Sequence, residues 1–158
     1  MTWMYRLVDL FSDPEKKLAR LPLRRGMTVV DYACGPGRYT VPAAGFVGPE
    51  GKVYAVDIQP LALKMVRDRA GKAALTNVEA VLVQAYDTGI PGECADLVLL
   101  LDAFHGIGDR AALLHEIRRI IKPDGVFLME PGHMDAAQAL SIVTATGLFR
   151  HVKTVGKP

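Results

Sequence analysis

Apolar runs of strand length alternate along this chain with segments in which apolar residues recur at helical spacing. Parallel strands need a crossover connection between them, usually a helix, so the alternation predicts an α/β fold with a mostly parallel sheet. Strands are expected at 27–31, 52–57, 78–84, 95–101, 126–130 and 149–155. Helices are expected at 3–11, 13–21, 39–47, 60–70, 109–121 and 135–146. We therefore expect a Rossmann-like three-layer sandwich with helices on both faces of the sheet.

The size and balance of the chain fit one folded domain. It has 158 residues, of which 50% are apolar and 23% are charged. These values are ordinary for a folded domain with its own core. We expect a single domain over 1–158, with a helical lead-in at 1–25 and a cofactor-binding core at 26–155. The net charge of +2 is too close to neutral to indicate a nucleic-acid partner.

The sequence also bears on where the protein is located in the cell and on whether it binds a metal. No stretch approaches the roughly 20 apolar residues of a membrane span, and the first ten residues lack the apolar run of a signal peptide. We therefore expect a cytoplasmic protein with no membrane span. Cys34 and Cys94 have neither zinc-site spacing nor the numbers of a disulfide framework, so no metal site is predicted.

A glycine-rich turn, Gly35-Pro36-Gly37, stands between an expected strand and an expected helix. Such a unit binds nucleotide-like ligands, because glycine lets the backbone approach the ligand and the helix N-terminus offers free N–H groups. Carboxylates stand at or near the ends of four expected strands, at Asp31, Asp57, Asp87 and Asp102. Ligands of open parallel sheets bind outside the carboxyl ends of the strands, so these side chains would surround one crevice.

The spacing of the carboxylates bears on which ligand is bound. Asp57 lies twenty residues after Gly37, where a carboxylate can accept hydrogen bonds from a ribose diol. A dinucleotide motif reads G-x-G-x-x-G, but Thr40 replaces its third glycine here, and Asp31 would repel a pyrophosphate. A ligand with an ammonium, a sulfonium and an adenosine accommodates several carboxylates, as S-adenosylmethionine does. The alternatives are an NAD-type dinucleotide-binding protein and a non-catalytic cofactor-binding module that acts by association.

Several motifs together carry a family resemblance. Residues 29–38, Val-Val-Asp-Tyr-Ala-Cys-Gly-Pro-Gly-Arg, resemble the first motif of class I S-adenosylmethionine-dependent methyltransferases, and residues 53–57 resemble the second. Residues 114–125 resemble the late helix–turn segment of the subgroup akin to the ubiquinone/menaquinone and arsenite methyltransferases. Segments 96–98 and 101–105 fall where that subgroup has its fourth-strand motif.

The resemblance assigns the methionine part of S-adenosylmethionine to the first turn. It implies that Ala33, Cys34, Gly35 and Gly37 approach the methionine part through their backbone, and that Asp31 helps to hold its amino group. The family usually has glycine at the position of Ala33, so this residue departs from the pattern.

The resemblance assigns the nucleoside part to later residues. Asp57 would bind the ribose hydroxyls and Ile58 would pack on the adenine. The contact with the adenine amino group is left open between Tyr86 and Asp87, and Leu101 would supply backbone contacts near the methionyl end. The remaining expected cofactor residues are Pro36, Thr40 and Gln59.

Methyl transfer from a sulfonium is an in-line displacement, which positioning and exclusion of water can catalyse without an obligatory acid or base. Asp102, His105, Glu130 and His133 are expected to face the crevice, and either histidine could accept a substrate proton. The catalytic candidates are Asp102, His105 and His133. The chain lacks the Asn-Pro-Pro-aromatic segment that enzymes methylating amino groups of nucleic acids and proteins often carry, so we expect a small-molecule acceptor and S-adenosylhomocysteine as product.

The last residues carry an expectation about assembly. Members of the family usually close the sheet with an antiparallel hairpin of two final strands, and this sequence stops at 158, where the seventh strand would begin. We therefore expect the final strand to be absent or truncated. The exposed edge that this leaves could be covered by a second copy of the chain, giving a homo-oligomer.

Overall fold

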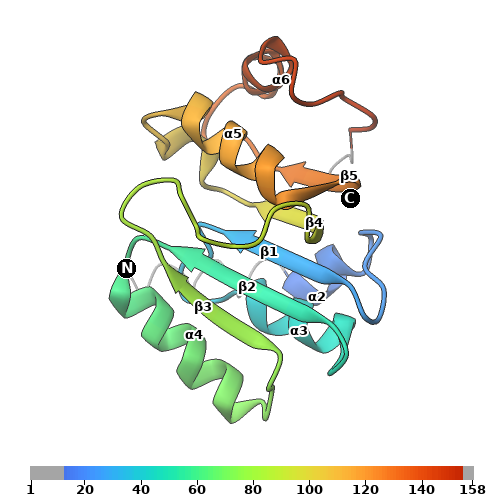
Figure 1. Ribbon diagram of the computed structural model, residues 1–158, viewed down its shortest axis with the longest axis vertical. Helices are drawn as coiled ribbons and strands as arrows, with labels where there is room; N and C mark the ends of the chain where they lie inside the picture. The colour runs from blue at the N-terminus through green and yellow to red at the C-terminus, as the bar shows by residue number, and fades with distance from the viewer. Residues whose placement is uncertain (1–12, 155–158) are drawn as a thin grey trace.

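Five parallel strands form one sheet within residues 13–154, the part of the chain that this computed structural model describes (Figure 1). The strands are β1 (Thr28–Tyr32), β2 (Lys52–Asp57), β3 (Val78–Leu82), β4 (Ala95–Leu100) and β5 (Ile121–Met129). Their order is β3-β2-β1-β4-β5, and each neighbouring pair is parallel. The chain adds β2 and β3 on one side of β1, and then β4 and β5 on the other side. Such a switch point, here between β1 and β4, opens a crevice at the carboxyl ends of the strands.

Helices cover both faces of the sheet, as the sequence pattern predicts (Figure 1). They are α2 (Pro14–Leu18), α3 (Thr40–Val47), α4 (Pro60–Lys72), α5 (Arg110–Ile120) and α6 (Ala136–Ala145), with a short 3₁₀ helix, η1 (Phe104–Gly106), between β4 and α5. Successive side chains of a strand point to opposite faces. Val29 of β1 accordingly packs with α2 and α3, whereas Val30 packs with α5 and α6.

Aspartates fix the starts of three helices. The carboxylate of Asp13 accepts hydrogen bonds from two backbone N–H groups of α2. Asp109 accepts one from Ala112 in α5 at 2.9 Å, and Asp135 accepts one from Gln138 in α6 at 3.0 Å. Each carboxylate satisfies N–H groups that have no partner inside the helix, which defines where the preceding loop ends.

The expected sixth strand at 149–155 is wrong for the part that is described. Phe149 packs against Phe127 of β5 with ring centroids 5.1 Å apart, but residues 149–154 form no strand. The reason is burial: Val152 is 81% exposed, so only one apolar side chain of this segment is anchored against the sheet. A strand at a sheet edge needs its alternate side chains buried on one face to fix its register.

The last strand begins earlier than expected. β5 starts at Ile121 instead of residue 126. Ile121 pairs with Ala95, but the next paired residues are Val126 and Leu97, so the intervening residues bulge out of the ladder. Pro123 explains why: it has no N–H for the ladder, and it disfavours helical conformation in the residue before it. The expected helix at 109–121 therefore ends at Ile120.

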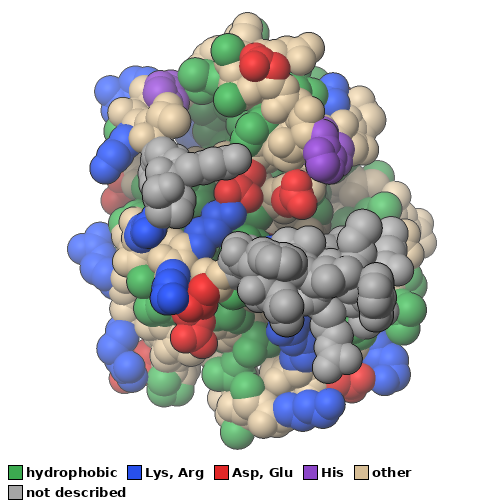
Figure 2. Space-filling model, turned by 180° about the vertical axis from the view of Figure 1, so that it is seen from behind, with side chains coloured by type: hydrophobic (Ala, Val, Ile, Leu, Met, Phe, Trp, Pro, Cys, Tyr) green, Lys and Arg blue, Asp and Glu red, His purple; other side chains and the backbone are tan. Residues whose placement is uncertain are grey.

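The surface of the described residues is mixed in charge. On the face seen in Figure 2, acidic side chains are interspersed with lysine and arginine side chains, and histidines lie beside them. No helix among the described residues is long and apolar enough to cross a membrane. The helix expected at 3–11 lies outside the described residues, and association through a free sheet edge stays a prediction.

Candidate functional site

The turn between β1 and α3 is built from left-handed backbone. Ala33, Gly35 and Gly37 have φ angles of 59°, 52° and 79°. Glycine adopts this conformation without steric cost, whereas Ala33 is one of the few described non-glycine residues that adopt it. The N–H of Cys34 donates to the carbonyl of Val56 at 3.0 Å, which ties the turn to β2.

The turn is also held against α4. A Cβ atom added at Gly37 would lie 3.0 Å from Cγ2 of Val66, so this glycine permits close packing between the turn and the helix. The guanidinium of Arg69 in α4 donates to the carbonyl of Pro36 at 3.1 Å. A ligand-binding role for Gly37 stays a prediction from the sequence, and the structure shows a packing role for this residue.

Asp57 at the end of β2 reaches across to the glycine turn. Its Oδ2 accepts a hydrogen bond from the N–H of Gly35 at 2.8 Å, and its Oδ1 accepts one from the N–H of Gln59 at 2.9 Å. Backbone N–H bonds of this kind fix the orientation of a carboxylate. The two segments that the sequence places twenty residues apart therefore meet through this one side chain.

Asp31 lies beneath the same turn and is only 2% exposed. The Thr40 hydroxyl donates to its Oδ2 at 2.6 Å. Burial raises the pKa of Asp31 to about 7, because removal from water disfavours the charged form; the Thr40 bond opposes this shift and the nearby charge of Asp57 adds to it. Asp31 is therefore poised between its neutral and ionised forms near neutral pH.

Cys34 is a buried packing residue in this turn. Burial raises the pKa of its thiol, and the neighbouring carboxylates of Asp31 and Asp57 raise it further. The thiol therefore stays protonated and is a poor nucleophile.

Exposed apolar side chains flank the end of β2. Ile58, Leu61 and Leu82 are 61%, 67% and 54% exposed, although most large apolar side chains of the described chain are buried. Leu82 of β3 pairs with Asp57 of β2 in the sheet, and Ile58 follows Asp57 directly. Exposed apolar side chains thus lie on the two residues next to Asp57, Ile58 along the chain and Leu82 across the sheet, and Leu61 follows in the first turn of α4.

Tyr86 and Asp87 lie in the loop between β3 and β4. The hydroxyl of Tyr32 donates to the carbonyl of Tyr86 at 2.8 Å, and the hydroxyl of Tyr86 accepts from the N–H of Asp109 at 2.9 Å. The carboxylate of Asp87 accepts from the N–H of Gly89 at 3.0 Å. These bonds hold the loop near the end of β1 and connect it to the start of α5.

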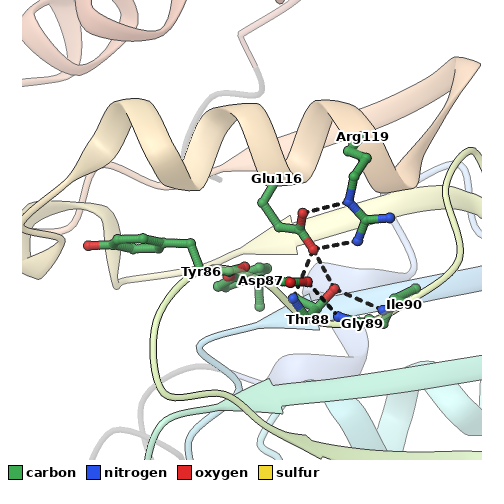
Figure 3. A network of polar contacts seen from close by, with 8 residues as sticks. Tyr86, Asp87, Thr88, Gly89, Ile90, Glu116 and Arg119 are labelled. Carbon is green, nitrogen blue, oxygen red and sulfur yellow. Dashed lines mark hydrogen bonds and ion pairs between the residues drawn. The ribbon is translucent and has the colours of Figure 1, made fainter.

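A buried carboxylate anchors this loop from α5 (Figure 3). Oε1 of Glu116 accepts hydrogen bonds from both the N–H and the hydroxyl of Thr88, at 2.9 and 2.6 Å. The guanidinium of Arg119 donates to both Glu116 oxygens at 2.7 Å. Sequence reasoning missed Glu116, although a signal was present: it lies among Leu113, Ile117 and Ile120 on the buried face of α5.

The ends of β4 and β5 bring the two candidate histidines together. His105 lies in η1 after β4, His133 lies between β5 and α6, and their ring centroids are 4.9 Å apart in an edge-to-face arrangement. Leu101 is buried, while Asp102 is exposed and has a left-handed φ of 56°. Glu130 pairs with Lys17 of the N-terminal segment, an ion pair that sequence reasoning did not predict.

The described residues also contain small cavities, which lie away from the candidate site. Two small cavities, of about 100 and 210 Å³, lie at the amino ends of the strands, away from the candidate site. Among residues 13–154, no cluster of three or more histidine, cysteine, aspartate or glutamate side chains could hold a metal ion. The backbone turn and the side chains around it define the candidate site.

The family model for a methyltransferase domain matches residues 23–154, which include the glycine turn, Asp57 and both candidate histidines. The chain belongs to this methyltransferase domain family. The methyltransferase domain is 29% identical over 109 residues to a demethylmenaquinone methyltransferase of Geobacillus stearothermophilus, covering 69% of this chain and 47% of the relative. It is 31% identical over 109 residues to one from Listeria monocytogenes, covering 69% and 45%. The chain thus spans about half the length of the curated relatives it matches.

Solved structures agree on the fold of the methyltransferase domain. A methyltransferase from Aquifex aeolicus described as S-adenosylmethionine-dependent superposes with a TM-score of 0.75 at 26% identity, covering 85% of this chain and 78% of that one. An arsenic(III) S-adenosylmethionine methyltransferase from Chlamydomonas reinhardtii gives a TM-score of 0.63 at 23% identity, covering 72% and 47%. The second likeness is one of fold alone.

Proposed function

We propose that this domain binds S-adenosylmethionine and transfers its methyl group to a small-molecule acceptor. The observation that carries the proposal is the Asp57 carboxylate, which the N–H groups of Gly35 and Gln59 orient beside the glycine turn. Each of its oxygens accepts one of these bonds and has a further lone pair, and a ribose diol supplies two donors for such a pair of acceptors.

The surrounding residues suit the rest of that cofactor. Bound S-adenosylmethionine would supply a methyl group activated by a positively charged sulfur. Asp31 beneath the turn would face the cationic methionine part, whose ammonium and sulfonium favour its ionised form. The exposed apolar side chains of Ile58, Leu61 and Leu82 offer a surface on which an adenine would be shielded from water.

The remaining predicted residues are proposed in supporting roles. The left-handed turn would present backbone N–H groups to the methionine part, with Thr40 holding Asp31 and the buried Leu101 bordering the crevice from β4. The loop containing Tyr86 and Asp87 would border the adenine. The residues of the turn proposed for backbone or packing contact are Ala33, Cys34, Gly35, Pro36 and Gly37.

A small-molecule acceptor is supported by the relatives and by the surface. The matched relatives include demethylmenaquinone methyltransferases, whose name gives a small molecule as the acceptor. Acidic and basic side chains are interspersed on the face shown in Figure 2, whereas a nucleic-acid partner favours clustered basic residues. Neither the NAD-type alternative nor the non-catalytic module is favoured by the family membership.

Two measurements test the proposal. Isothermal titration calorimetry with S-adenosylhomocysteine should show saturable binding, and the same titration with NADH should show none. Transfer of labelled methyl from S-adenosylmethionine to a panel of small metabolites should then identify an acceptor. Tight binding of NADH alone would refute the cofactor assignment, and proven S-adenosylhomocysteine binding with no transfer to any acceptor would favour the non-catalytic module.

A further inference from the structure

The two histidines beyond β4 and β5 are arranged as a pair at the carboxyl edge of the sheet. Their rings meet edge to face, with an interplanar angle of 73° and centroids 4.9 Å apart, although 27 residues separate His105 from His133. β4 neighbours β1 in the sheet, and the glycine turn follows β1. His105 therefore follows the strand next to β1, and His133 follows the strand one place farther from it.

His105 is held in a defined orientation. Its Nδ1 is buried and has no hydrogen-bond partner among the described residues, and a Cβ added at Gly132 would collide with it. The guanidinium of Arg110 donates to the carbonyls of Phe104 and His105 at 3.2 and 3.0 Å, and Phe104 is fully buried. With Nδ1 enclosed and the η1 backbone fixed, Nε2 is the nitrogen left for chemistry.

The nearby carboxylates are less suited to accept a proton. Glu130 is paired with Lys17, whose ammonium also donates to the Tyr39 hydroxyl at 3.3 Å. Asp102 is exposed to water. An imidazole is the side chain whose ordinary titration lies nearest neutral pH, which makes it an effective base there.

We propose that His105 and His133 form the proton-accepting pair for the methyl acceptor, and that this domain therefore acts on acceptors with a dissociable proton on oxygen or nitrogen. The inference rests on the proposed function and deepens it. The acceptor lone pair forms the new bond to the methyl carbon, and the electrons of the broken carbon–sulfur bond stay on sulfur. The acceptor proton passes to Nε2 of His105 and from there to His133 or water.

This chemistry separates two classes of acceptor. A phenol or an ammonium-forming amine must lose a proton before or during transfer, and a base speeds this step by about 100-fold to 10,000-fold. A thioether has no proton to lose, so a base has no role in its methylation, whereas a tertiary amine is protonated near neutral pH and belongs to the first class. An ordered imidazole pair is therefore useful only for the first class.

The test uses the full chain and the variants His105→Gln, His133→Gln and His115→Gln. His115 is an exposed histidine on α5 and serves as the matched control. Labelled methyl transfer is measured on a panel of phenols of graded acidity and primary amines, with two thioethers as proton-free acceptors. Binding of S-adenosylhomocysteine is measured by calorimetry for every variant.

We expect transfer to a proton-bearing acceptor, a loss of about 100-fold in kcat at neutral pH for His105→Gln, and no change for His115→Gln. The loss should shrink with more acidic phenols and at higher pH, where the acceptor is already ionised. In histidine-selective NMR spectra, that acceptor should shift the imidazole signals of His105 and His133 but not those of His115.

The opposite results would overturn the inference. These are transfer only to the proton-free acceptors, or His105→Gln with unchanged kcat and pH profile. Absence of S-adenosylhomocysteine binding by the unaltered protein, or binding with no transfer to any acceptor, is a different failure, because it refutes the proposed function itself. The charged groups nearest in the chain or the fold are left unaltered in every variant, so that they act equally on each pH profile. These groups are Arg110, Asp102, Asp135 and the Lys17–Glu130 pair.

Discussion

The Thr40 hydroxyl at the start of α3 donates a 2.6 Å hydrogen bond to Oδ2 of Asp31 in β1. This bond closes the glycine turn from below, because the two residues lie on either side of it. It also gives a buried carboxyl group one fixed donor. Burial still outweighs this bond, and the pKa of Asp31 is raised to about 7.

The raised pKa of Asp31 predicts a pH-dependent stability. An unfolded chain would release this proton near the ordinary value of 3.8, whereas the folded protein keeps it up to about 7. The folded state therefore binds more protons between these values, and stability falls as pH rises, by at most about 1.4 kcal/mol per pH unit. Urea unfolding between pH 4 and 8 should show this decline in the unaltered protein and a weaker one in Asp31→Asn. Equal slopes in both proteins would contradict the assignment.

The same group predicts a pH-dependent affinity. A cationic ligand favours the ionised form of Asp31, so binding of S-adenosylmethionine should tighten as pH rises through about 7 and release a proton. Calorimetry in buffers of different ionisation enthalpy measures that proton. Asp31→Asn should remove the release, and binding without proton exchange by the unaltered protein would argue against contact between Asp31 and the cation.

Asp57→Asn should weaken S-adenosylhomocysteine binding by about 1–3 kcal/mol, because the charge that strengthens its hydrogen bonds is lost. Asp68→Asn is the matched control, since Asp68 is an exposed carboxylate paired with Lys64 on the surface of α4. It should leave the dissociation constant unchanged. Equal affinities for Asp57→Asn and the unaltered protein would remove the ribose assignment.

Gly37→Ala should destabilise the fold by about 1–3 kcal/mol, because a side chain at this left-handed position is strained and would crowd Val66. Gly45→Ala is the control within α3, where an added Cβ meets nothing within 4 Å. It should stabilise the protein by about 0.5–1 kcal/mol, since alanine is the better helix former. Thermal unfolding of both variants measures the contrast, and a neutral Gly37→Ala would show that the turn tolerates a side chain.

Glu116→Ala should destabilise the protein by about 1–3 kcal/mol, because it leaves the Thr88 donors unpaired in a buried place. Burial opposes ionisation of Glu116, but the bonds from Arg119 and Thr88 hold its pKa below the usual value. The stability that ionised Glu116 contributes is therefore fully present above the ordinary glutamate pKa. It is lost as the pH falls through the lowered pKa of the folded protein. Urea midpoints at pH 7 and pH 3 should differ less in the variant than in the unaltered protein.

Much of the architecture follows from local sequence. Apolar runs at β1, β2 and β4 are buried on both faces of a parallel sheet, and such strands are continuous in apolar residues, so each is visible in sequence. Asp109 and Asp135 mark helix starts for a reason confined to a few neighbouring residues. Local sequence predicts the start of β5 and a strand at 149–155 wrongly. Whether such a segment joins the sheet depends on the strand that it meets in the tertiary structure.

The sequence by itself determined the strand–turn–helix unit, the left-handed glycines and the carboxylate at the end of β2, since these depend on residue type and short spacing. Only the tertiary structure decided how distant groups meet. It placed the Glu116 carboxylate on Thr88, Lys17 on Glu130, and His105 against His133. These contacts depend on strand order and on the packing of helices over the sheet, which no local pattern of residues specifies.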